Sequence, residues 1–290
     1  MGAPKSGTTW LQTIMNAHPQ IACFGEGHFV EQIVLPMQAL LRHYNRKLAV
    51  VAEAVYSGEP FYPEIDGEDA LRLIRPLIVG LMGRAVPELR QKRRRRGPER
   101  GGRNSAMAEL GLLWWGDKTP AYSRHLDELD QLFPFSRFID IRRDPRDVAV
   151  SVLYHGLRAG SLTDIKGDTA RRRELIRHAL SRWNEHNHNV DRACDKLGER
   201  LLRVRYEELV ADPAAQFRRL YEHLDGVDVT DEIIAASVTT CSFAAMSGGR
   251  QPGETDDTSF FRSGTIGQHA VDLTDAERDL VTELAGRPEG

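Results

Sequence analysis

Residues 2–10 of the chain read GAPKSGTTW, and the residues that follow, LQTIMNAH, carry apolar side chains at helical spacing. Two glycines and a proline beside small hydroxyl residues favour a tight loop whose backbone N–H groups point inward. Because Leu11, Ile14 and Met15 recur as on one face of a helix, we expect the loop to open directly into a helix. Free N–H groups at a helix N-terminus, with Lys5 inside the loop, form a binding site for a phosphate group.

The position of the lysine indicates which phosphate compound the loop binds. A loop for a nucleoside triphosphate reads G-x-x-x-x-G-K-[ST], with the lysine directly after the second glycine. The spacing from Gly2 to Gly7 fits, but Thr8 stands at the lysine position and Lys5 lies inside the loop. The positive charge therefore lies near the first phosphate rather than near a β/γ pair. A Gly-Ser-Thr turn before an ordinary helix is the alternative interpretation.

The composition is that of an ordinary globular protein, with 290 residues, 28% of them charged, and a formal net charge of −3. This length suffices for one large α/β domain, and the near-neutral charge gives no reason to expect nucleic-acid or membrane binding. No stretch approaches the roughly 18 consecutive apolar residues of a membrane span. The cysteines, Cys23, Cys194 and Cys241, are far apart and odd in number, which predicts reduced thiols in a cytoplasmic protein.

Predicted strands alternate with helical segments along the chain. Short apolar runs at 110–115, 138–141 and 201–204 predict buried strands, and a further short strand precedes Glu26. This order predicts a three-layer α/β fold, a parallel sheet flanked by helices. Only residues 1–3 precede the phosphate loop, which in such folds follows a buried strand. We therefore expect the first strand of the sheet to be missing from this chain.

Two helices and a basic segment lie between the first two predicted strands. Helical patterns cover residues 31–56 and begin again near Asp66. From residue 86 to 105 the sequence becomes basic and rich in glycine, with five consecutive cations at 92–96. We expect a solvated, disordered loop at 86–105 within a single domain spanning 1–290. A contact with nucleic acid or another anionic polymer is the less favoured interpretation.

Residues 142–151 read RRDPRDVAVS and join the end of a predicted strand to the start of a helix. Asp144 suits the N-cap, Pro145 suits the first helical position, and Asp147 complements the helix dipole. These roles leave the neighbouring arginines unexplained.

Arg143 lies at the carboxyl edge of that strand, and Ser151 follows two helical turns later. Together they can bind one phosphate group, the arginine through a forked, charge-assisted pair and the serine through its hydroxyl. The alternatives are a plain solvated helix start, or a magnesium site of a nucleotide kinase with Asp140 as ligand. Thr8 argues against the kinase, because it occupies the position of the triphosphate-binding lysine.

The two motifs resemble those of sulfotransferases that use 3′-phosphoadenosine 5′-phosphosulfate (PAPS). PKSGTTW resembles their 5′-phosphosulfate loop, and the spacing from Arg143 to Ser151 resembles their 3′-phosphate motif. The segment 201–225 is similar to the family segment in which a tyrosine, here Tyr206, approaches the adenine. Residues 260–267, FFRSGTIG, resemble the late R-K-G-x-x-G loop that closes over the 3′-phosphate, with Ser263 in place of the lysine.

The resemblance implies a P-loop-like fold and transfer of a sulfuryl group from PAPS to a hydroxyl or an amine, without a metal. For Trp10, which the family stacks on the adenine, and for Tyr206, ordinary core packing is the alternative. The resemblance assigns nucleotide binding to Pro4, Lys5, Ser6, Gly7, Thr8, Thr9, Trp10, Arg143, Ser151, Tyr206, Arg262, Ser263 and Gly264.

The catalytic base is predicted from a difference between this chain and the cytosolic sulfotransferases. Cytosolic sulfotransferases of small molecules carry K-T-H with histidine as base, whereas residues 118–120 here are Lys-Thr-Pro. EGHF at 26–29 looks more like heparan-type sulfotransferases, whose glutamate is the base, although the chain otherwise resembles bacterial-type members. We expect Glu26 to be the base, if partial burial makes it basic enough, and His28 to be a second candidate. Lys118 would hold the glutamate or the sulfuryl oxygens, and Lys5 the leaving phosphate.

Other interpretations are a turn-capping Glu26 and a structural His28. The histidines at 186 and 188 lie two residues apart and so face different sides of a helix, which predicts a solvated helix face rather than a metal site. The rival functions are a kinase-like nucleotide-binding protein and an inactive module that binds the product nucleotide, 3′-phosphoadenosine 5′-phosphate (PAP). The acceptor would be a small molecule, a glycan or a lipid, and no motif in the sequence indicates which.

Overall fold

The computed structural model describes residues 1–286 except 57, 59, 61 and 95–110. The chain predicted as one domain divides into two compact units, which are described separately. The first unit comprises Met1–Gly25, Gly111–Arg124 and Arg137–Gly290, and the second comprises Glu26–Leu110 and His125–Ser136.

The strands of the first unit are parallel, as the sequence predicts. Strand β1 (Ile21–Gly25) pairs with β2 (Trp114–Lys118), and β3 (Phe138–Arg142) pairs with β4 (Leu201–Arg205). Gly2 forms a single parallel bridge with Ile141, so the residues just before the phosphate loop lie alongside β3. The N-terminal ammonium group also donates to the Ile139 carbonyl at 2.6 Å.

One predicted strand lies further along the chain than expected. The apolar run at 110–115 predicts the strand there, but β2 extends over Trp114–Lys118 and includes Gly116 and Asp117. Its start is fixed by the pairing of Trp114 with Ile21, a partner that no local pattern reveals. Residue 110 lies outside the described residues.

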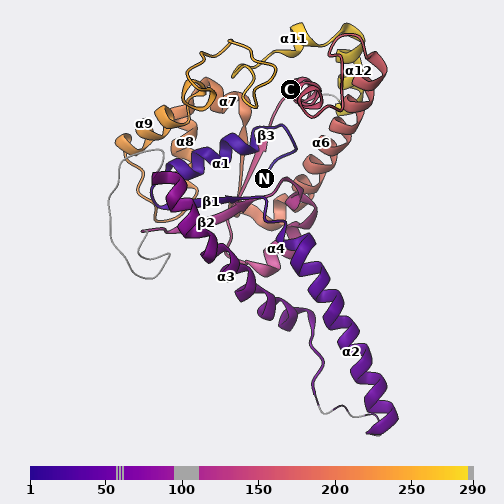
Figure 1. Ribbon diagram of the computed structural model, residues 1–290. Coiled ribbons are helices and arrows are strands. Elements are labelled where there is room, and N and C mark those ends of the chain that lie inside the picture. The colour runs from indigo at the N-terminus through magenta and orange to yellow at the C-terminus, as the bar shows by residue number, and fades with distance from the viewer. Residues whose placement is uncertain (57, 59, 61, 95–110, 287–290) are drawn as a thin grey trace. The chain divides into compact units, whose positions relative to one another are not determined.

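Helices pack against the strands of the first unit in two groups. Figure 1 shows α1, α8 and α9 on one side of the strands and α6 and α12 on the other. One core gathers the apolar face of α1 with β3, β4 and α8, and a second core lies among α5, α6 and α12. The helices are α1 (Thr8–Ala17), α5 (Pro145–Arg158), α6 (Thr169–Leu197), α7 (Tyr206–Ala211), α8 (Pro213–Glu222), α9 (Asp231–Thr240), α10 (Phe243–Ser247), α11 (His269–Asp272) and α12 (Asp275–Ala285).

The second unit is helical. A π-helical turn at Val30–Val34 leads into α2 (Leu35–Val55), which is followed by α3 (Gly67–Arg94) and α4 (Leu126–Leu132). The prediction of a loop from residue 86 is wrong up to residue 94, because α3 continues to Arg94. Four of its buried apolar side chains recur every four residues and so form one apolar stripe along the helix: Ile74, Ile78, Met82 and Val86. The rest of the predicted loop, 95–105, lies outside the described residues.

Within the part of the chain that the structure describes, no helix combines the length and the hydrophobicity of a membrane-crossing segment. The three cysteines are free thiols. Burial raises the pKa of Cys23 and of Cys241 to about 12, so both thiols stay protonated near neutral pH.

Candidate functional site

The phosphate loop has the backbone that the sequence predicts. Helix α1 begins at Thr8, and Gly7 at its N-cap has φ 97° and ψ 14°, a left-handed conformation. A Cβ on Gly7 would lie 2.6 Å from Tyr206 Cδ2, so glycine is required both by φ and by space. Among the described residues, no side chain caps the first N–H groups of α1. The positive end of this helix is therefore directed toward the loop, as an anion site requires.

Two buried polar atoms beside the loop lack a hydrogen-bond partner among the described residues. They are the Oγ of the fully buried Ser6 and the Nε of Arg143. Arg143 also donates from Nη1 to the Lys5 carbonyl at 3.2 Å, and its guanidinium carbon lies 4.2 Å from the Tyr206 ring centroid. An unsatisfied buried donor or hydroxyl is costly unless a ligand completes it. The loop, Arg143 and Tyr206 are thus brought together, as the sequence predicts.

The two aromatic side chains predicted for the adenine pack against each other. Trp10 and Tyr206 meet edge to face with ring centroids 5.5 Å apart. Trp10 Nε1 donates to the Cys241 carbonyl at 2.9 Å, and Phe217 lies 6.4 Å from its ring. Core packing accounts for part of this arrangement, and contact of either ring with adenine stays a prediction.

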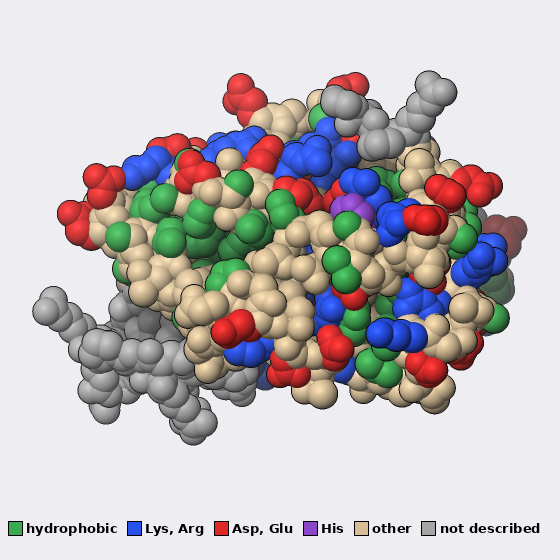
Figure 2. Space-filling model, turned by 90° about the horizontal axis from the view of Figure 1, so that it is seen from above, with side chains coloured by type: hydrophobic (Ala, Val, Ile, Leu, Met, Phe, Trp, Pro, Cys, Tyr) green, Lys and Arg blue, Asp and Glu red, His purple; other side chains and the backbone are tan. Residues whose placement is uncertain are grey.

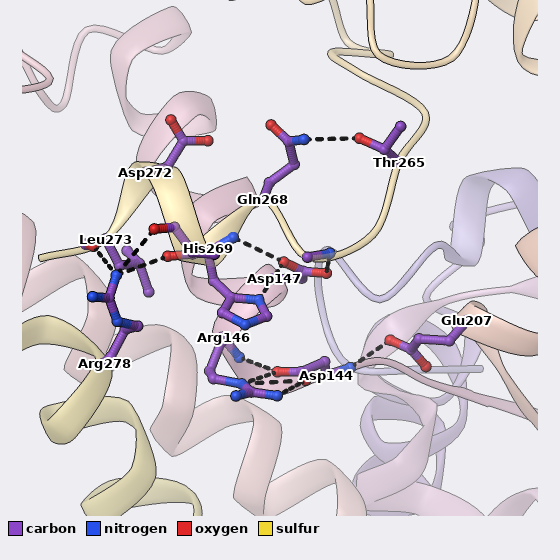
Figure 3. Close-up of polar contacts among 12 residues, drawn as sticks. Asp144, Arg146, Asp147, Glu207, Thr265, Gln268, His269, Asp272, Leu273 and Arg278 are labelled. Atoms are coloured by element: carbon purple, nitrogen blue, oxygen red, sulfur yellow. Dashed lines mark hydrogen bonds and ion pairs between the residues drawn. The ribbon is translucent and has the colours of Figure 1, made fainter. Parts of the chain in front are cut away.

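The start of α5 has the predicted cap and one unpredicted role. Asp144 caps the helix by accepting from Arg146 N at 2.8 Å, and the Asp144 N–H donates to Glu207. Asp147 is only 2% exposed and accepts from the backbone N–H groups of Gly267 and His269. Figure 3 shows its position beside His269. Its carboxylate also lies 2.9 Å from His269 Nδ1. Asp147 therefore anchors the end of the late loop and the start of α11, a more specific role than complementing the helix dipole.

The late loop lies against α5 and the phosphate loop. The Arg262 guanidinium carbon is 3.5 Å from the centroid of the Tyr154 ring, and Tyr154 lies one helical turn after Ser151. Arg262 is therefore brought to the side of α5 that carries the half-buried Ser151. Lys5 Nζ lies 5.6 Å from the centroid of the Phe260 ring, which connects this loop to the phosphate loop. The first unit thus brings the predicted nucleotide-binding segments together.

Two further residues shape the late loop and were missed by the sequence analysis. Gly264 has φ 65°, and a Cβ there would overlap the Phe243 ring, so Phe243 packs directly beneath the loop. Arg250 lies over the same ring at 5.4 Å and donates to the carbonyls of Glu254, Phe261 and Arg262. Phe243 and Arg250 have no recognisable motif around them, because their partners in the late loop come close only when the chain is folded.

The structure fits neither the alternative interpretation of Asp140 as a magnesium ligand nor the predicted solvated position of His186. Asp140 is fully buried, with one oxygen 2.7 Å from His186 Nε2 and the other 3.1 Å from Arg142 Nε. Both oxygens are therefore engaged, which does not fit a magnesium ligand. The prediction of a solvated helix face is wrong for His186, which is 3% exposed, because α6 turns it onto β3. His188 is exposed as predicted.

The predicted catalytic residues lie in both units. Lys118, at the end of β2 in the first unit, is buried, and Glu26 and His28 begin the second unit. The backbone φ is 71° at Lys5, 44° at Glu26 and 47° at His28, and these are the three described non-glycine residues with positive φ. Strain of this kind is concentrated at functional sites, so it supports a functional role for all three.

Glu26 and His28 belong to a cluster that includes an unpredicted carboxylate. His28 Nε2 lies 3.8 Å from Glu26 Oε2, and His28 Nδ1 lies 4.0 Å from Glu31 Oε1. Glu31 Oε1 is in turn 3.7 Å from His125 Nε2. The Glu26 side chain is 53% exposed, so solvent still reaches the predicted base. The spacing of Glu31 three residues after His28 was the available signal for this contact.

Comparison with known proteins gives one consistent family. Residues 1–231 match the sulfotransferase family. Protein-tyrosine sulfotransferase A of Caenorhabditis elegans is 25% identical over 225 residues, which make up 77% of this chain and 48% of that protein. Omega-hydroxy-beta-dihydromenaquinone-9 sulfotransferase Stf3 of Mycobacterium tuberculosis is 30% identical over 116 residues, 37% of this chain and 27% of that protein.

A solved structure supports the fold. The crystal structure of mouse sulfotransferase SULT7A1 complexed with PAP superposes with a TM-score of 0.55 at 18% identity, covering 98% of this chain and 80% of that one. The chain spans about half the length of the protein-tyrosine sulfotransferase that it matches. The family match includes the phosphate loop, the Arg143 motif and Tyr206, and ends before Arg262. With its P-loop-like α/β fold, the chain belongs to the sulfotransferase family.

Proposed function

We propose that this protein transfers the sulfuryl group of PAPS to a hydroxyl group of an acceptor. The observation that carries the proposal is the phosphate loop with Lys5 inside it, beside a buried Ser6 Oγ and an Arg143 Nε that lack partners among the described residues. Membership in the sulfotransferase family, and the PAP named with a structure of the same fold, support this assignment.

The donor set fits a nucleotide with phosphates at both the 5′ and 3′ positions. Residues 4–10 would hold the 5′-phosphate through N–H groups at the start of α1 and the Ser6 hydroxyl. Arg143, Ser151 and the loop of Arg262, Ser263 and Gly264 would hold the 3′-phosphate, and Trp10 and Tyr206 would border the adenine. When bound, PAPS supplies the activated sulfuryl group.

The protein's own residues would contribute charge and proton transfer. Lys5 and the helix end provide positive potential where negative charge develops on the leaving phosphate. Glu26 would accept the proton of the acceptor hydroxyl, with His28 as the alternative base. Lys118 would orient the glutamate or the sulfuryl oxygens. These roles stay predictions for the residues named.

A hydroxyl acceptor is favoured over an amine by the names of the relatives, which refer to protein tyrosine and to omega-hydroxy-beta-dihydromenaquinone-9. A small molecule, a glycan or a lipid with a hydroxyl group is our proposed acceptor class. The cytoplasmic location expected from three separate cysteines stays a prediction.

Isothermal calorimetry with PAP, ADP and ATP, each with and without magnesium, tests the nucleotide. We expect PAP to bind far more tightly than ADP or ATP, without a requirement for magnesium. Equal or magnesium-dependent ATP binding would instead support a kinase. Transfer of labelled sulfate from PAPS to a panel of hydroxyl compounds then separates an active enzyme from an inactive PAP-binding module.

A further inference from the structure

Arg262, the predicted 3′-phosphate ligand of the late loop, is already paired with two carboxylates. Its Nε donates to Asp257 Oδ1 at 2.9 Å, and its Nη2 lies 2.9 Å from Asp272 Oδ2 as an ion pair. One face of the guanidinium is stacked on the Tyr154 ring at 3.5 Å. Burial opposes the charge on Arg262, but these carboxylates outweigh it and raise its pKa, so the guanidinium stays charged. An arginine needed for an anionic ligand is thus neutralised from within the protein.

The two carboxylates differ in what else they do. Asp272 also accepts from the Tyr154 hydroxyl at 2.8 Å and is largely buried, so it belongs to the packing of α11 on α5. Asp257 lies five residues before Arg262 on the same loop, and its side chain is 48% exposed. Asp257 is therefore the carboxylate that can turn into solvent without disturbing a helix.

The shape of the loop does not depend on the Asp257 side chain. Backbone hydrogen bonds run from Gly253 N to Ser263 O at 2.8 Å and from Asp256 N to Arg262 O at 3.0 Å. The Arg250 guanidinium also donates to the Arg262 carbonyl at 2.8 Å. These contacts fix the backbone on both sides of Asp257. Changing its carboxylate to an amide should consequently alter charge and leave the loop in place.

We propose that Asp257 is an internal counter-ion of Arg262, which a 3′-phosphate must displace in order to bind. This inference rests on the proposed function. A phosphate beside the guanidinium gains from its positive charge but is repelled by a carboxylate already within hydrogen-bond distance of it. On the face of the molecule that Figure 2 shows, acidic side chains lie beside basic ones. Asp257 thereby sets how strongly the protein distinguishes nucleotides with and without a 3′-phosphate.

The test compares Asp257→Asn with the wild-type chain in binding PAP and AMP, which lacks the 3′-phosphate. Asparagine keeps the Oδ1 acceptor for Arg262 Nε and removes the charge. Because partly exposed ion pairs are weak, we expect PAP to bind about three- to fivefold more tightly to the variant, with AMP unchanged. Asp256→Asn is the matched control. It removes the same charge from the neighbouring position, where Asp256 accepts from Thr258 instead, and should leave both affinities unchanged.

A double-variant cycle assigns the effect to Arg262. In an Arg262→Ala background, Asp257→Asn should no longer tighten PAP binding. Unchanged or weaker PAP binding by Asp257→Asn, or an equal gain for AMP, would overturn the proposal that Asp257 is a counter-ion of Arg262. If the wild-type chain still prefers PAP over AMP, the proposed function stands. A wild-type chain that binds PAP no better than AMP would overturn both.

Discussion

At the scale of single residues, Lys5 combines a strained backbone with a charged side chain that we predict contacts the leaving phosphate. Its φ of 71° carries a steric cost that any residue with a Cβ shares, so Lys5→Ala leaves the strain unchanged and removes only the charged side chain. Since Lys5 would contact the leaving phosphate before and during the reaction, we expect PAP affinity and kcat to fall together. A charge-assisted hydrogen bond corresponds to a loss of about 10- to 100-fold in affinity.

Calorimetry and steady-state kinetics measure both effects of Lys5→Ala. Lys166→Ala removes the same charge from an exposed position in the first unit and serves as control. A loss of kcat with PAP affinity intact would contradict ground-state contact and would restrict Lys5 to the transition state.

The base can be assigned by two substitutions that preserve backbone strain. Glu26→Gln and His28→Gln both keep a side chain at the positive φ values of 44° and 47°. If Glu26 is the base, Glu26→Gln should lower kcat by about 10²–10⁴-fold and leave the PAP dissociation constant nearly unchanged. Turnover by His28→Gln should then stay within a few-fold of wild type.

The reverse result, loss only in His28→Gln, would make histidine the base. It would also give Glu26 and Glu31, 3.8 and 4.0 Å from the His28 ring nitrogens, the role of orienting it. Near-normal turnover in both variants would show that the acceptor is acidic enough to need no strong base. The pH dependence of kcat/KM in each variant distinguishes a missing base from a general structural loss.

At the scale of elements, β3 and α6 are joined by the buried Asp140–His186 pair. Burial acts to raise the pKa of Asp140, but the hydrogen bond from His186 and the nearby charges lower it overall. The stabilisation is therefore complete above the unfolded-state pKa of about 3.9 and is lost as the pH falls toward the lower folded-state value. Asp140→Asn should lower the free energy of unfolding by about 1.5–3 kcal/mol at neutral pH, since it weakens hydrogen bonds to a charged group.

Urea unfolding at pH 7 and near pH 3 measures the difference between the Asp140→Asn variant and wild type, which should shrink at the lower pH. Asp191→Asn is the control. Asp191 contacts Arg142 and Arg203 from a half-exposed position, so its loss should cost less than about 1 kcal/mol. A difference for Asp140→Asn that is independent of pH would mean that lost packing, rather than charge, is responsible.

The elements could be predicted where local pattern and tertiary pairing agree. The helix after Gly7, the strands at 138–141 and 201–204 and the cap at Asp144 were identified because each has a local signal. Strand β2 was placed too early because its limits depend on β1. His186 was misjudged because its polarity suggested solvent, whereas its partner Asp140 lies 46 residues away in the sequence.

At the scale of the whole molecule, the segments predicted to bind the nucleotide and the meeting of Lys5, Arg143 and Tyr206 could be predicted, but the contacts that hold the late loop could not. Lys5, Arg143 and Tyr206 carry recognisable patterns, and the first unit brings them into contact. Asp147 and Arg250 hold the late loop in place through backbone groups, so their role depends on the path of the chain rather than on its side chains. Contacts between a side chain and the backbone of a distant segment produce no residue spacing that could be recognised in the sequence.

Hydrogen–deuterium exchange in the presence of PAP tests this assembly as a whole. If the first unit forms one nucleotide site, PAP should slow exchange together at residues 2–10, 143–151 and 250–264, which are far apart in the sequence. Helix α2, Leu35–Val55 of the second unit, serves as an internal reference and should be unchanged. Short labelling times are needed, because bound ligand also stabilises the fold, by about 2.7 kcal/mol at 100 times the dissociation constant, and slows exchange that requires global unfolding. Protection of residues 2–10 without 250–264 would show that the late loop does not contact the nucleotide.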